Sequence, residues 1–395
     1  MEPTNVRAIA RERSVSKMGL NPFPWYREMR EKDPVHFDEH TQVWELFAYQ
    51  DILQILKSPT LFSSERGRQM PGHERSGSIL STDPPRHNKL RGLIAQAFTP
   101  RAISRMEDRM RAIVNKLLGA GVKDGKIDII SDLAYPLPVI VIAEMLGIPP
   151  NERDMFKRWS DGVVSNSTEQ AQAGYEALDR YFRDIVNQRR KMPWDDLVSD
   201  LLTARLEDEP LTDDEIVDFC VLLLVAGNET TTNLLGNAVL CFDENPTILD
   251  EIRADPSLLP DAIEEVLRFR SPVQRISRVA TADTLINSKQ IKADQPVFLW
   301  IASANRDEKQ FPQAEIFDSK RSPNRHLAFG NGIHACIGAP LARLETRVAF
   351  ECLLARFTML RRDRTVELQP IQSFFGYGVE HLPVQIAASP FMKIS

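Results

Sequence analysis

One cysteine of this chain lies in a loop whose neighbours could present its sulfur as an anion. Gly330 and Gly332 precede Cys336, Gly338 follows it, and an alanine- and leucine-rich segment begins directly behind the loop. Glycine allows positive φ and a close backbone approach to the sulfur. Amide N–H groups of the turn and of the next helix start can then hydrogen-bond a thiolate. A thiolate held in this way is suited to bind the iron of a flat haem, where it favours O–O cleavage.

The alternative for Cys336 is the role of a small, inert core residue, which is usual for an isolated cysteine in an intracellular protein. The surroundings favour the ligand role, because Phe329 and His334 stand beside the glycines of the loop. The other cysteines lie in apolar stretches with helical spacing, and we expect them in the core: Cys220, Cys241 and Cys352.

A second unusual segment interrupts the longest predicted helix. Ala226 and Gly227 are followed by Asn228, Glu229 and Thr230, although glycine inside a helix costs about 1 kcal/mol relative to alanine. A segment that departs from the usual residue preferences of a helix often marks a functional site. The small side chains of Ala226 and Gly227 would leave room beside a bulky ligand. Thr230 could bond an i−4 carbonyl and bend the helix, or hold a water molecule. A kink with an ion-paired Glu229 is the purely structural alternative.

Two further pairs have helical spacing. Glu265 and Arg268 lie at i, i+3 on one face of a predicted helix, and as a surface ion pair they would contribute little to stability. His87 and Arg91 lie at i, i+4 in a helix that an Asp cap and prolines open, which suits a helix start. Alone, this pair would be solvated.

The elements that must position these residues are predicted to be mainly α with small β-sheets, an α+β fold. The longest helix begins at a capping box, Thr212 to Glu215, and Pro246 closes it. Leu222 to Val225 make it apolar on every face, so we expect it to be buried. Predicted helices cover 23–32, 49–57, 86–98, 100–119, 136–147, 150–162, 170–191, 195–205, 213–243, 246–254, 260–268 and 339–356. Predicted strands lie near 34–37, 42–47, 274–279, 284–287, 296–301 and 366–387.

In this order along the chain, these motifs resemble those of the cytochrome P450 family, from about residue 22 to the C-terminus. The likeness is greatest to bacterial members of Bacillus type. The resemblance implies the P450 fold, with haem b between the long central helix and the cysteine loop and its helix. Cys336 would be the iron ligand, and the residues beside the haem would be Ala226, Gly227, Phe329 and Gly330.

The resemblance also implies roles for other residues. Glu229 and Thr230 match the family's acid–threonine pair, in which Thr230 orients a proton donor towards dioxygen and Glu229 relays protons from solvent. The expected partners of the two haem propionates are His87, Arg91, Arg278 and His334, with Arg275 as a further candidate.

Glu265 and Arg268 match the family's Glu-x-x-Arg motif, which implies a buried structural pair that supports the cysteine loop. The family often adds an arginine from a Pro-x-Arg-Phe segment. This chain has Ile316 there, which leaves Arg321 as a candidate third partner.

The composition is ordinary for a globular protein of 395 residues, with 43% hydrophobic and 26% charged residues. No segment reads as a linker or a repeat, so we expect a single domain over 1–395. A formal net charge of −6 disfavours nucleic acid as a partner. The polar N-terminus offers no membrane anchor, and unpaired cysteine spacing favours the cytoplasm. We expect a monomer.

The sequence contains no pattern for binding a flavin or an iron–sulfur cluster. Electrons must therefore come from other proteins, by resemblance a ferredoxin or flavodoxin with an NAD(P)H-dependent reductase. We hypothesise that this partner docks on the face behind Cys336, at basic residues such as Arg86 and Lys89.

The expected function is a monooxygenase that uses O2 to hydroxylate or epoxidise a hydrophobic small molecule such as a fatty acid, terpenoid or steroid. By resemblance, substrate contacts lie in the 66–80 loop, the helices around 155–190, and the stretches 273–276 and 374–377. Arg66, Arg68 and Arg75 could anchor a carboxylate. The alternatives are a peroxide-driven peroxygenase, a haem-thiolate ligand-binding or sensor protein without turnover, and a protein without haem in which Cys336 is structural.

Overall fold

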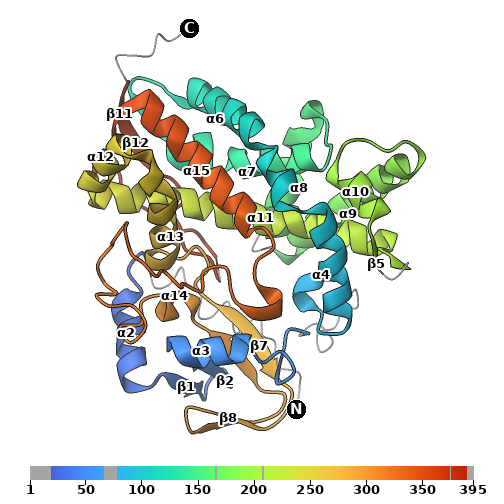
Figure 1. Cartoon of the computed structure of the whole chain (residues 1–395), viewed down its shortest axis with the longest axis vertical. Coiled ribbons are helices and arrows are strands. Elements are labelled where there is room, and N and C mark those ends of the chain that lie inside the picture. Colours follow the sequence, from blue (N-terminus) through green and yellow to red (C-terminus); the bar gives the residue numbers. More distant parts are fainter. Residues whose placement is uncertain (1–18, 66–77, 165–166, 207–208, 374, 389–395) are drawn as a thin grey trace.

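The computed structural model describes residues 19–65, 78–164, 167–206, 209–373 and 375–388. Helices make up most of the molecule, in agreement with the α+β prediction, and the short strands form one group beside α2 and α3 and another at the opposite end, beside α12 (Figure 1). The α-helices are α2 (Phe23–Lys32), α3 (Tyr49–Leu56), α4 (Arg86–Ala97), α5 (Pro100–Ser104), α6 (Glu107–Gly121), α7 (Pro136–Met145), α8 (Arg153–Val164), α9 (Thr168–Lys191), α10 (Leu197–Thr203), α11 (Asp213–Glu244), α12 (Pro246–Ala254), α13 (Leu259–Phe269), α14 (Ile301–Ala304) and α15 (Ala339–Arg356).

The described strands form two larger sheets and two hairpins. In the first sheet the order is β1-β2-β10-β7-β3, with β2 parallel to β10 and the other neighbours antiparallel. The second sheet has the order β11-β12-β4. The strands are β1 (Val35–Asp38), β2 (Val43–Leu46), β3 (Phe62–Ser63), β4 (Lys126–Asp128), β5 (Arg205–Leu206), β6 (Glu209–Pro210), β7 (Ile276–Ala280), β8 (Thr284–Ile286), β9 (Lys289–Ile291), β10 (Pro296–Leu299), β11 (Phe357–Arg362) and β12 (Pro383–Ala388).

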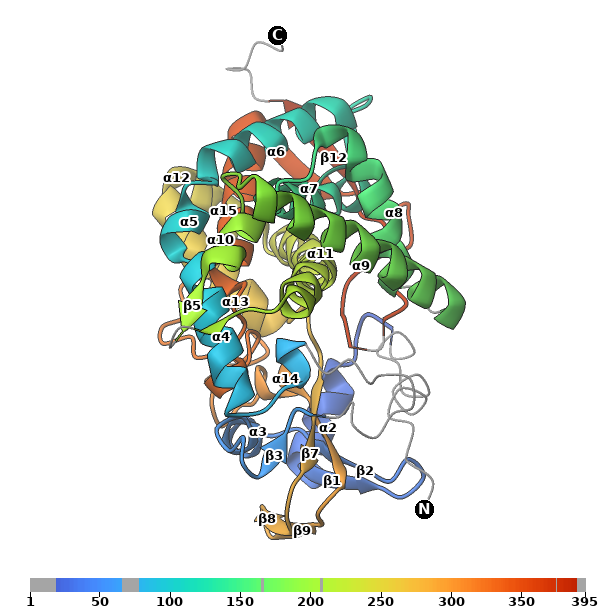
Figure 2. The ribbon, with the colours of Figure 1, turned by 90° about the vertical axis from the view of Figure 1, so that its right-hand side faces the viewer.

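The long helix α11 passes through the middle of the molecule, where Figure 2 views it nearly end-on. The predicted capping box is present, because Thr212 Oγ1 accepts the Glu215 N–H at 3.3 Å and Glu215 Oε2 accepts the Thr212 N–H at 2.9 Å. Leu224, Leu235 and Cys241 on this helix are buried. The prediction of a buried central helix is confirmed, and α15 crosses in front of it in Figure 1.

Two predicted elements differ from the structure. The helix expected over 100–119 is broken into α5 and α6 between Ser104 and Glu107. The strand expected over 366–387 is wrong for most of its length, since β12 begins only at Pro383. Before β12 the backbone is bonded to a distant loop instead of a strand: Tyr377 N–H donates to Pro272 O at 2.8 Å, and Phe375 O accepts the N–H of Gln274 at 2.7 Å.

A buried carboxylate joins α13 to the segment that leads to the cysteine loop. Glu265 accepts hydrogen bonds from Arg268 Nε and Nη2, both at 2.7 Å, and from Arg321 Nε at 3.1 and 3.2 Å. The Asp318 N–H and Asn324 Nδ2 donate to it as well, at 2.9 and 3.1 Å. Arg321 therefore takes the place of the third partner, as predicted. The alternative of a surface ion pair is wrong, because Glu265 and Arg268 are fully buried.

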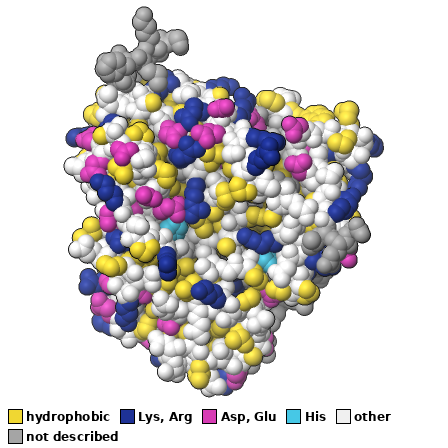
Figure 3. Space-filling view, in the orientation of Figure 1, with side chains coloured by type: hydrophobic (Ala, Val, Ile, Leu, Met, Phe, Trp, Pro, Cys, Tyr) yellow, Lys and Arg dark blue, Asp and Glu magenta, His cyan; other side chains and the backbone are white. Residues whose placement is uncertain are grey.

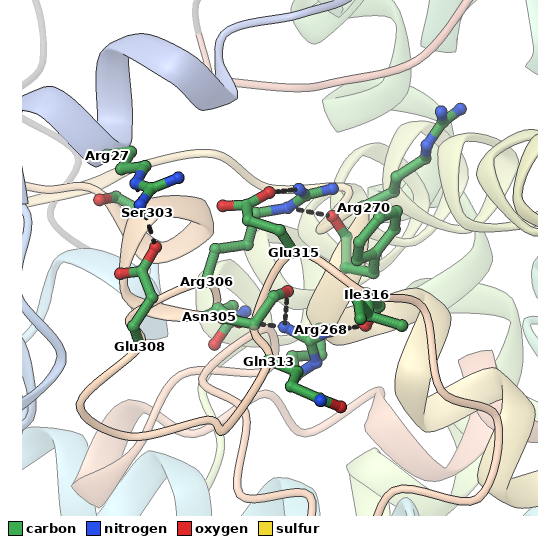
Figure 4. A network of polar contacts seen from close by, with 12 residues as sticks. Arg27, Arg268, Arg270, Ser303, Asn305, Arg306, Glu308, Gln313, Glu315 and Ile316 are labelled. Carbon is green, nitrogen blue, oxygen red and sulfur yellow. Dashed lines mark hydrogen bonds and ion pairs between the residues drawn. The ribbon is translucent and has the colours of Figure 1, made fainter.

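The other donors of Arg268 bind backbone oxygens, which ties α13 to two loops. Figure 4 shows its guanidinium between the carbonyl oxygens of Asn305 and Ile316, at 2.9 and 3.1 Å. The Arg306–Glu315 ion pair lies beside it. These contacts fix the course of the chain from α14 towards the cysteine loop.

The Arg321→Ala variant tests how much this network contributes to stability. Loss of one partner from a buried ion pair is expected to lower the free energy of unfolding by about 3 kcal/mol, measured by guanidinium denaturation. The control is Lys32→Ala, whose pair with Glu28 is exposed, and which we expect to change it by less than about 0.5 kcal/mol. Equal effects of both variants would contradict a special role of Arg321.

Candidate functional site

The cysteine loop reaches α15 through turns that require glycine. Gly330 and Gly332 have φ of +70° and +72°. A Cβ at Gly332 would also lie 2.4 Å from the carbonyl oxygen of Leu56, so the loop packs directly on the end of α3. The Cys336 N–H donates to Phe329 O at 2.8 Å and closes the loop. The sulfur is thereby held in front of the first turn of α15.

The N-cap residue of α15 is Gly338, which has no side chain to cap the helix, and the sulfur of Cys336 accepts hydrogen bonds from the Gly338 and Ala339 amides at this end of the helix. Part of the cysteine is exposed, yet the protein around the rest withdraws it from water, and this burial raises the pKa of Cys336 above its usual value. Hydrogen bonds from the amides of Gly338 and Ala339, and then the charges of Arg91 and Arg343, act in the opposite direction. A metal ion on the sulfur removes the proton outright, so the amides are placed to bond a ligated thiolate.

The four residues predicted to hold propionates lie together. The rings of His87 and His334 are 4.1 Å apart between centroids, and the Nε2 atom of each is buried without a hydrogen-bond partner in the described part of the chain. Burial, and then the charges of His87, Arg278 and Arg91, lower the pKa of His334 to about 3. Burial also lowers the pKa of Arg278, to about 10. Two buried ring nitrogens of this cluster are thus left without a hydrogen-bond partner.

Haem b fits this deficit, because its two carboxylates would supply acceptors and negative charge to the cluster. Arg275, the further candidate, lies elsewhere: its guanidinium is 4.4 Å from the Phe298 ring centroid and 5.0 Å from that of Trp300. The structure thus brings together four of the five predicted propionate partners.

In the unusual segment of α11, Ala226 is exposed although most of the middle of the helix is buried. Its neighbour Gly227 has a different reason to be small, since a Cβ there would lie 2.7 Å from Cδ1 of Ile142 on α7. Thr230 Oγ1 donates to Ala226 O at 2.7 Å, which is the first of the two geometries considered. Because the hydroxyl proton of Thr230 is donated to this carbonyl oxygen, the hydroxyl can only accept a hydrogen bond from a group outside the helix.

Glu229 is not the ion-paired residue of the structural alternative. Its Oε1 atom is buried and has no hydrogen-bond partner in the described ranges. Burial raises the pKa of Glu229, against a smaller opposite effect of a hydrogen bond from Ser373. The carboxyl group therefore holds its proton to higher pH than an ordinary glutamate does, which is the behaviour of a proton donor.

Sequence reasoning missed a charged group between α13 and the cysteine loop. Glu264 binds Arg343 through both oxygens, at 2.6 and 2.8 Å, and His326 Nε2 at 3.1 Å. Burial alone would raise the pKa of Glu264, but these hydrogen bonds lower it to about 2. Arg343 lies 4.5 Å from the Phe329 ring centroid. Only the position of Glu264 beside Glu265 could have drawn attention to it.

Two residues of the docking hypothesis are already paired. Arg86 forms an ion pair with Glu215, and Lys89 with Glu209 at 3.0 Å. Both acids lie more than a hundred residues further along the chain, so no local pattern could have revealed them. Residues 66–77, with Arg66, Arg68 and Arg75, and Phe374 lie outside the described residues. None of the helices in the described ranges has both the length and the apolar character needed to cross a membrane.

The Cytochrome P450 family model matches residues 144–387 of the chain. Cytochrome P450 109 of Bacillus spizizenii is 44% identical over 379 residues, which cover 93% of this chain and 92% of that protein. The crystal structure of CYP109E1 from Bacillus megaterium in complex with testosterone is 41% identical, with a TM-score of 0.87 over 92% of this chain and 99% of that chain. Its complex with corticosterone is 40% identical, with a TM-score of 0.88 over 93% and 99%.

The variant Arg278→Leu tests the cationic cluster. A hydrogen bond between charged groups contributes about 1.5–3 kcal/mol, so we expect haem to leave the variant at least about tenfold faster. The measurement is the rate of haem transfer to apomyoglobin. Arg361→Leu, at an exposed position on β11, is the matched control. Unchanged release from the Arg278 variant would remove this residue from the propionate set.

Proposed function

We propose that this chain, which belongs to the cytochrome P450 family and is a haem-b monooxygenase, hydroxylates a steroid or a hydrophobic molecule of similar size. The observation that carries the proposal is the convergence of three features: the Cys336 sulfur on the first turn of α15, the cationic cluster, and the exposed Ala226 beside the acid–threonine pair. The substrate class is supported by the two steroid complexes of a relative about 40% identical.

Haem, when bound, supplies the activation of O2 with two electrons and two protons, which places one oxygen atom in the substrate and the other in water. The chain's own residues hold it in place. Cys336 would bind the iron, and the amides of Gly338 and Ala339 would stabilise the negative sulfur. Four side chains would bind the carboxylates: His87, Arg91, Arg278 and His334.

Proton delivery is assigned to the acid–threonine pair. Thr230 cannot donate outward while its hydroxyl is bonded to Ala226 O, so it holds a water molecule or another donor by accepting a hydrogen bond from it. Glu229, with its raised pKa, gives a proton to that donor and regains one from solvent. The pair thus moves protons without either residue being consumed.

Electrons are proposed to come from a ferredoxin or flavodoxin with an NAD(P)H-dependent reductase. Figure 3 shows Lys and Arg side chains spread over the face that carries α15 and α4. Since Arg86 and Lys89 are paired, we assign docking to exposed bases nearer the cysteine loop, such as Lys57 and Arg325. Lys57 adjoins this loop, because its Cα is 3.9 Å from a Cβ placed on Gly332.

A spectral titration of the ferric protein tests the substrate class. Testosterone and corticosterone are expected to shift the Soret band from low to high spin at lower concentration than a fatty acid or a terpenoid does, because a molecule that fills the pocket displaces the water on iron. A fatty acid or terpenoid that binds more tightly would overturn the steroid proposal. A Soret band that no compound moves would exclude all of these classes.

The variant Thr230→Ala separates a reductase-driven enzyme from a peroxygenase. We expect product formed per NAD(P)H consumed to fall about tenfold, because the proton donor loses its acceptor. The control is Thr232→Ala, whose hydroxyl bonds Ala134 O at 3.1 Å, and which should keep coupling intact. An unchanged Thr230 variant that is also fully active with hydrogen peroxide would favour the peroxygenase.

A further inference from the structure

Ser373 and residues 375–378, called the C-terminal turn below, lie on the acid-bearing face of α11. An ideal Cβ at Gly376 would be 2.5 Å from Glu229 Oε1, and one at Gly378 would be 2.2 Å from Asn233 Oδ1. One helical turn further along α11, Asn237 Nδ2 donates to Tyr377 O at 3.1 Å. Both glycines have negative φ (neither is among the positive-φ positions of the chain). Neighbouring side chains, and not the backbone conformation, require glycine at both positions: Asn233 at Gly378, and Glu229 together with Ser373 of the turn itself at Gly376.

The turn is also held from its other side. Gly376 forms a β-bridge with Val273, Tyr377 N–H donates to Pro272 O at 2.8 Å, and Tyr377 Oη donates to Leu20 O at 2.8 Å. These bonds leave the turn little freedom to move relative to α11. A group on the turn can therefore act as a fixed partner for a side chain of the helix.

Ser373 is such a group. Its Oγ accepts the Gly376 N–H at 2.9 Å, which uses one lone pair and fixes the direction of the hydroxyl hydrogen. That hydrogen is donated to the carboxylate of Glu229. The serine is buried, so water does not compete for the same contact. Among the described residues, Ser373 is thus a defined donor to Glu229, on a segment far along the chain.

We propose that Ser373 is a positioning residue for proton delivery: it holds the Glu229 carboxyl group next to Thr230, and Gly376 provides the space in which that carboxyl group lies. The inference rests on the proton-donating role proposed for Glu229 and adds the partner that sets where this acid points. Ser373 itself neither gains nor loses a proton.

The local charges support a role for this single contact. Among the described residues, burial and Ser373 are the two causes that shift the pKa of Glu229, and no charged side chain contributes. Tyr377 on the same turn directs its hydroxyl to Leu20 O, and α7, which packs on Gly227 through Ile142, presents an apolar side chain there. Loss of the Ser373 donor therefore has no neighbouring charge to compensate for it.

The experiment compares matched variants on the holoenzyme. Ser373→Ala removes the donor, and Ser373→Thr keeps it. Gly376→Ala places a methyl group against Glu229, whereas Gly378→Ala places one against Asn233 in the same turn. The first readout is the C=O stretch of protonated Glu229 in infrared spectra over a pH titration, isolated by subtraction of the Glu229→Gln variant. Glu345 provides an internal reference band, because burial raises its pKa to about 8.

The second readout is product formed per NAD(P)H consumed. We expect Ser373→Ala to shift the titration of Glu229 to higher pH, since the carboxylate loses a donor, and to lower coupling by about tenfold. Ser373→Thr restores both. Gly376→Ala moves the Glu229 band, and Gly378→Ala leaves it in place.

Two results would overturn the inference, and they are distinguishable. If the Glu229 band is the same in the wild type and in the Ser373→Ala and Gly376→Ala variants, the contact does not position the acid. If the band moves but coupling is unchanged, the contact exists without a role in proton delivery. Full coupling in Glu229→Gln would in addition withdraw the role proposed for Glu229 itself.

Discussion

A carboxylate that has no access to water needs a donor for each of its lone pairs, and Glu265 obtains them from parts of the chain that are otherwise unconnected. Its partner Arg268 donates to Asn305 O at 2.9 Å, and Asn305 Oδ1 accepts the Leu327 N–H at 2.6 Å. Leu327 O in turn accepts the N–H of Gly330 at 2.8 Å. A continuous series of hydrogen bonds therefore leads from α13 into the cysteine loop.

The functional site contains groups that are unfavourable without a partner: a buried sulfur beside helix amides, and a cluster of histidine and arginine side chains. The sulfur of Cys336 is placed on helix amides, which favour its anion, while burial favours the thiol. In the histidine–arginine cluster, the buried Nε2 atoms of His87 and His334 have no hydrogen-bond partner among the described residues. Haem b would relieve both conditions, since its iron would stabilise the thiolate and its carboxylates would neutralise the cluster. Cofactor binding and the stability of this region are thus expected to be linked.

Sequence reasoning succeeded where the interaction is local. The glycines around Cys336 and the capping box at Thr212 act within a few residues, so their spacing is enough to predict them. It failed where partners meet only in the fold: Lys89 with Glu209, or Glu229 with Ser373. The strand predicted over 366–387 failed for the same reason, because the backbone of Phe375 and Tyr377 is bonded to Pro272 and Gln274. Alternation of side chains carries no information about such distant bonds.

The unequal burial of the cysteines has a consequence for handling the protein. Cys220, Cys241 and Cys352 are buried, so reagents in solution do not reach their sulfur atoms. Cys336 is the exposed one of the four, and iron coordination would shield its sulfur. Thiol-reactive dyes should therefore label chains that lack haem in preference to loaded ones. The extent of labelling becomes a measure of how completely a preparation has been assembled, and an oxidant would damage its haem-free fraction first.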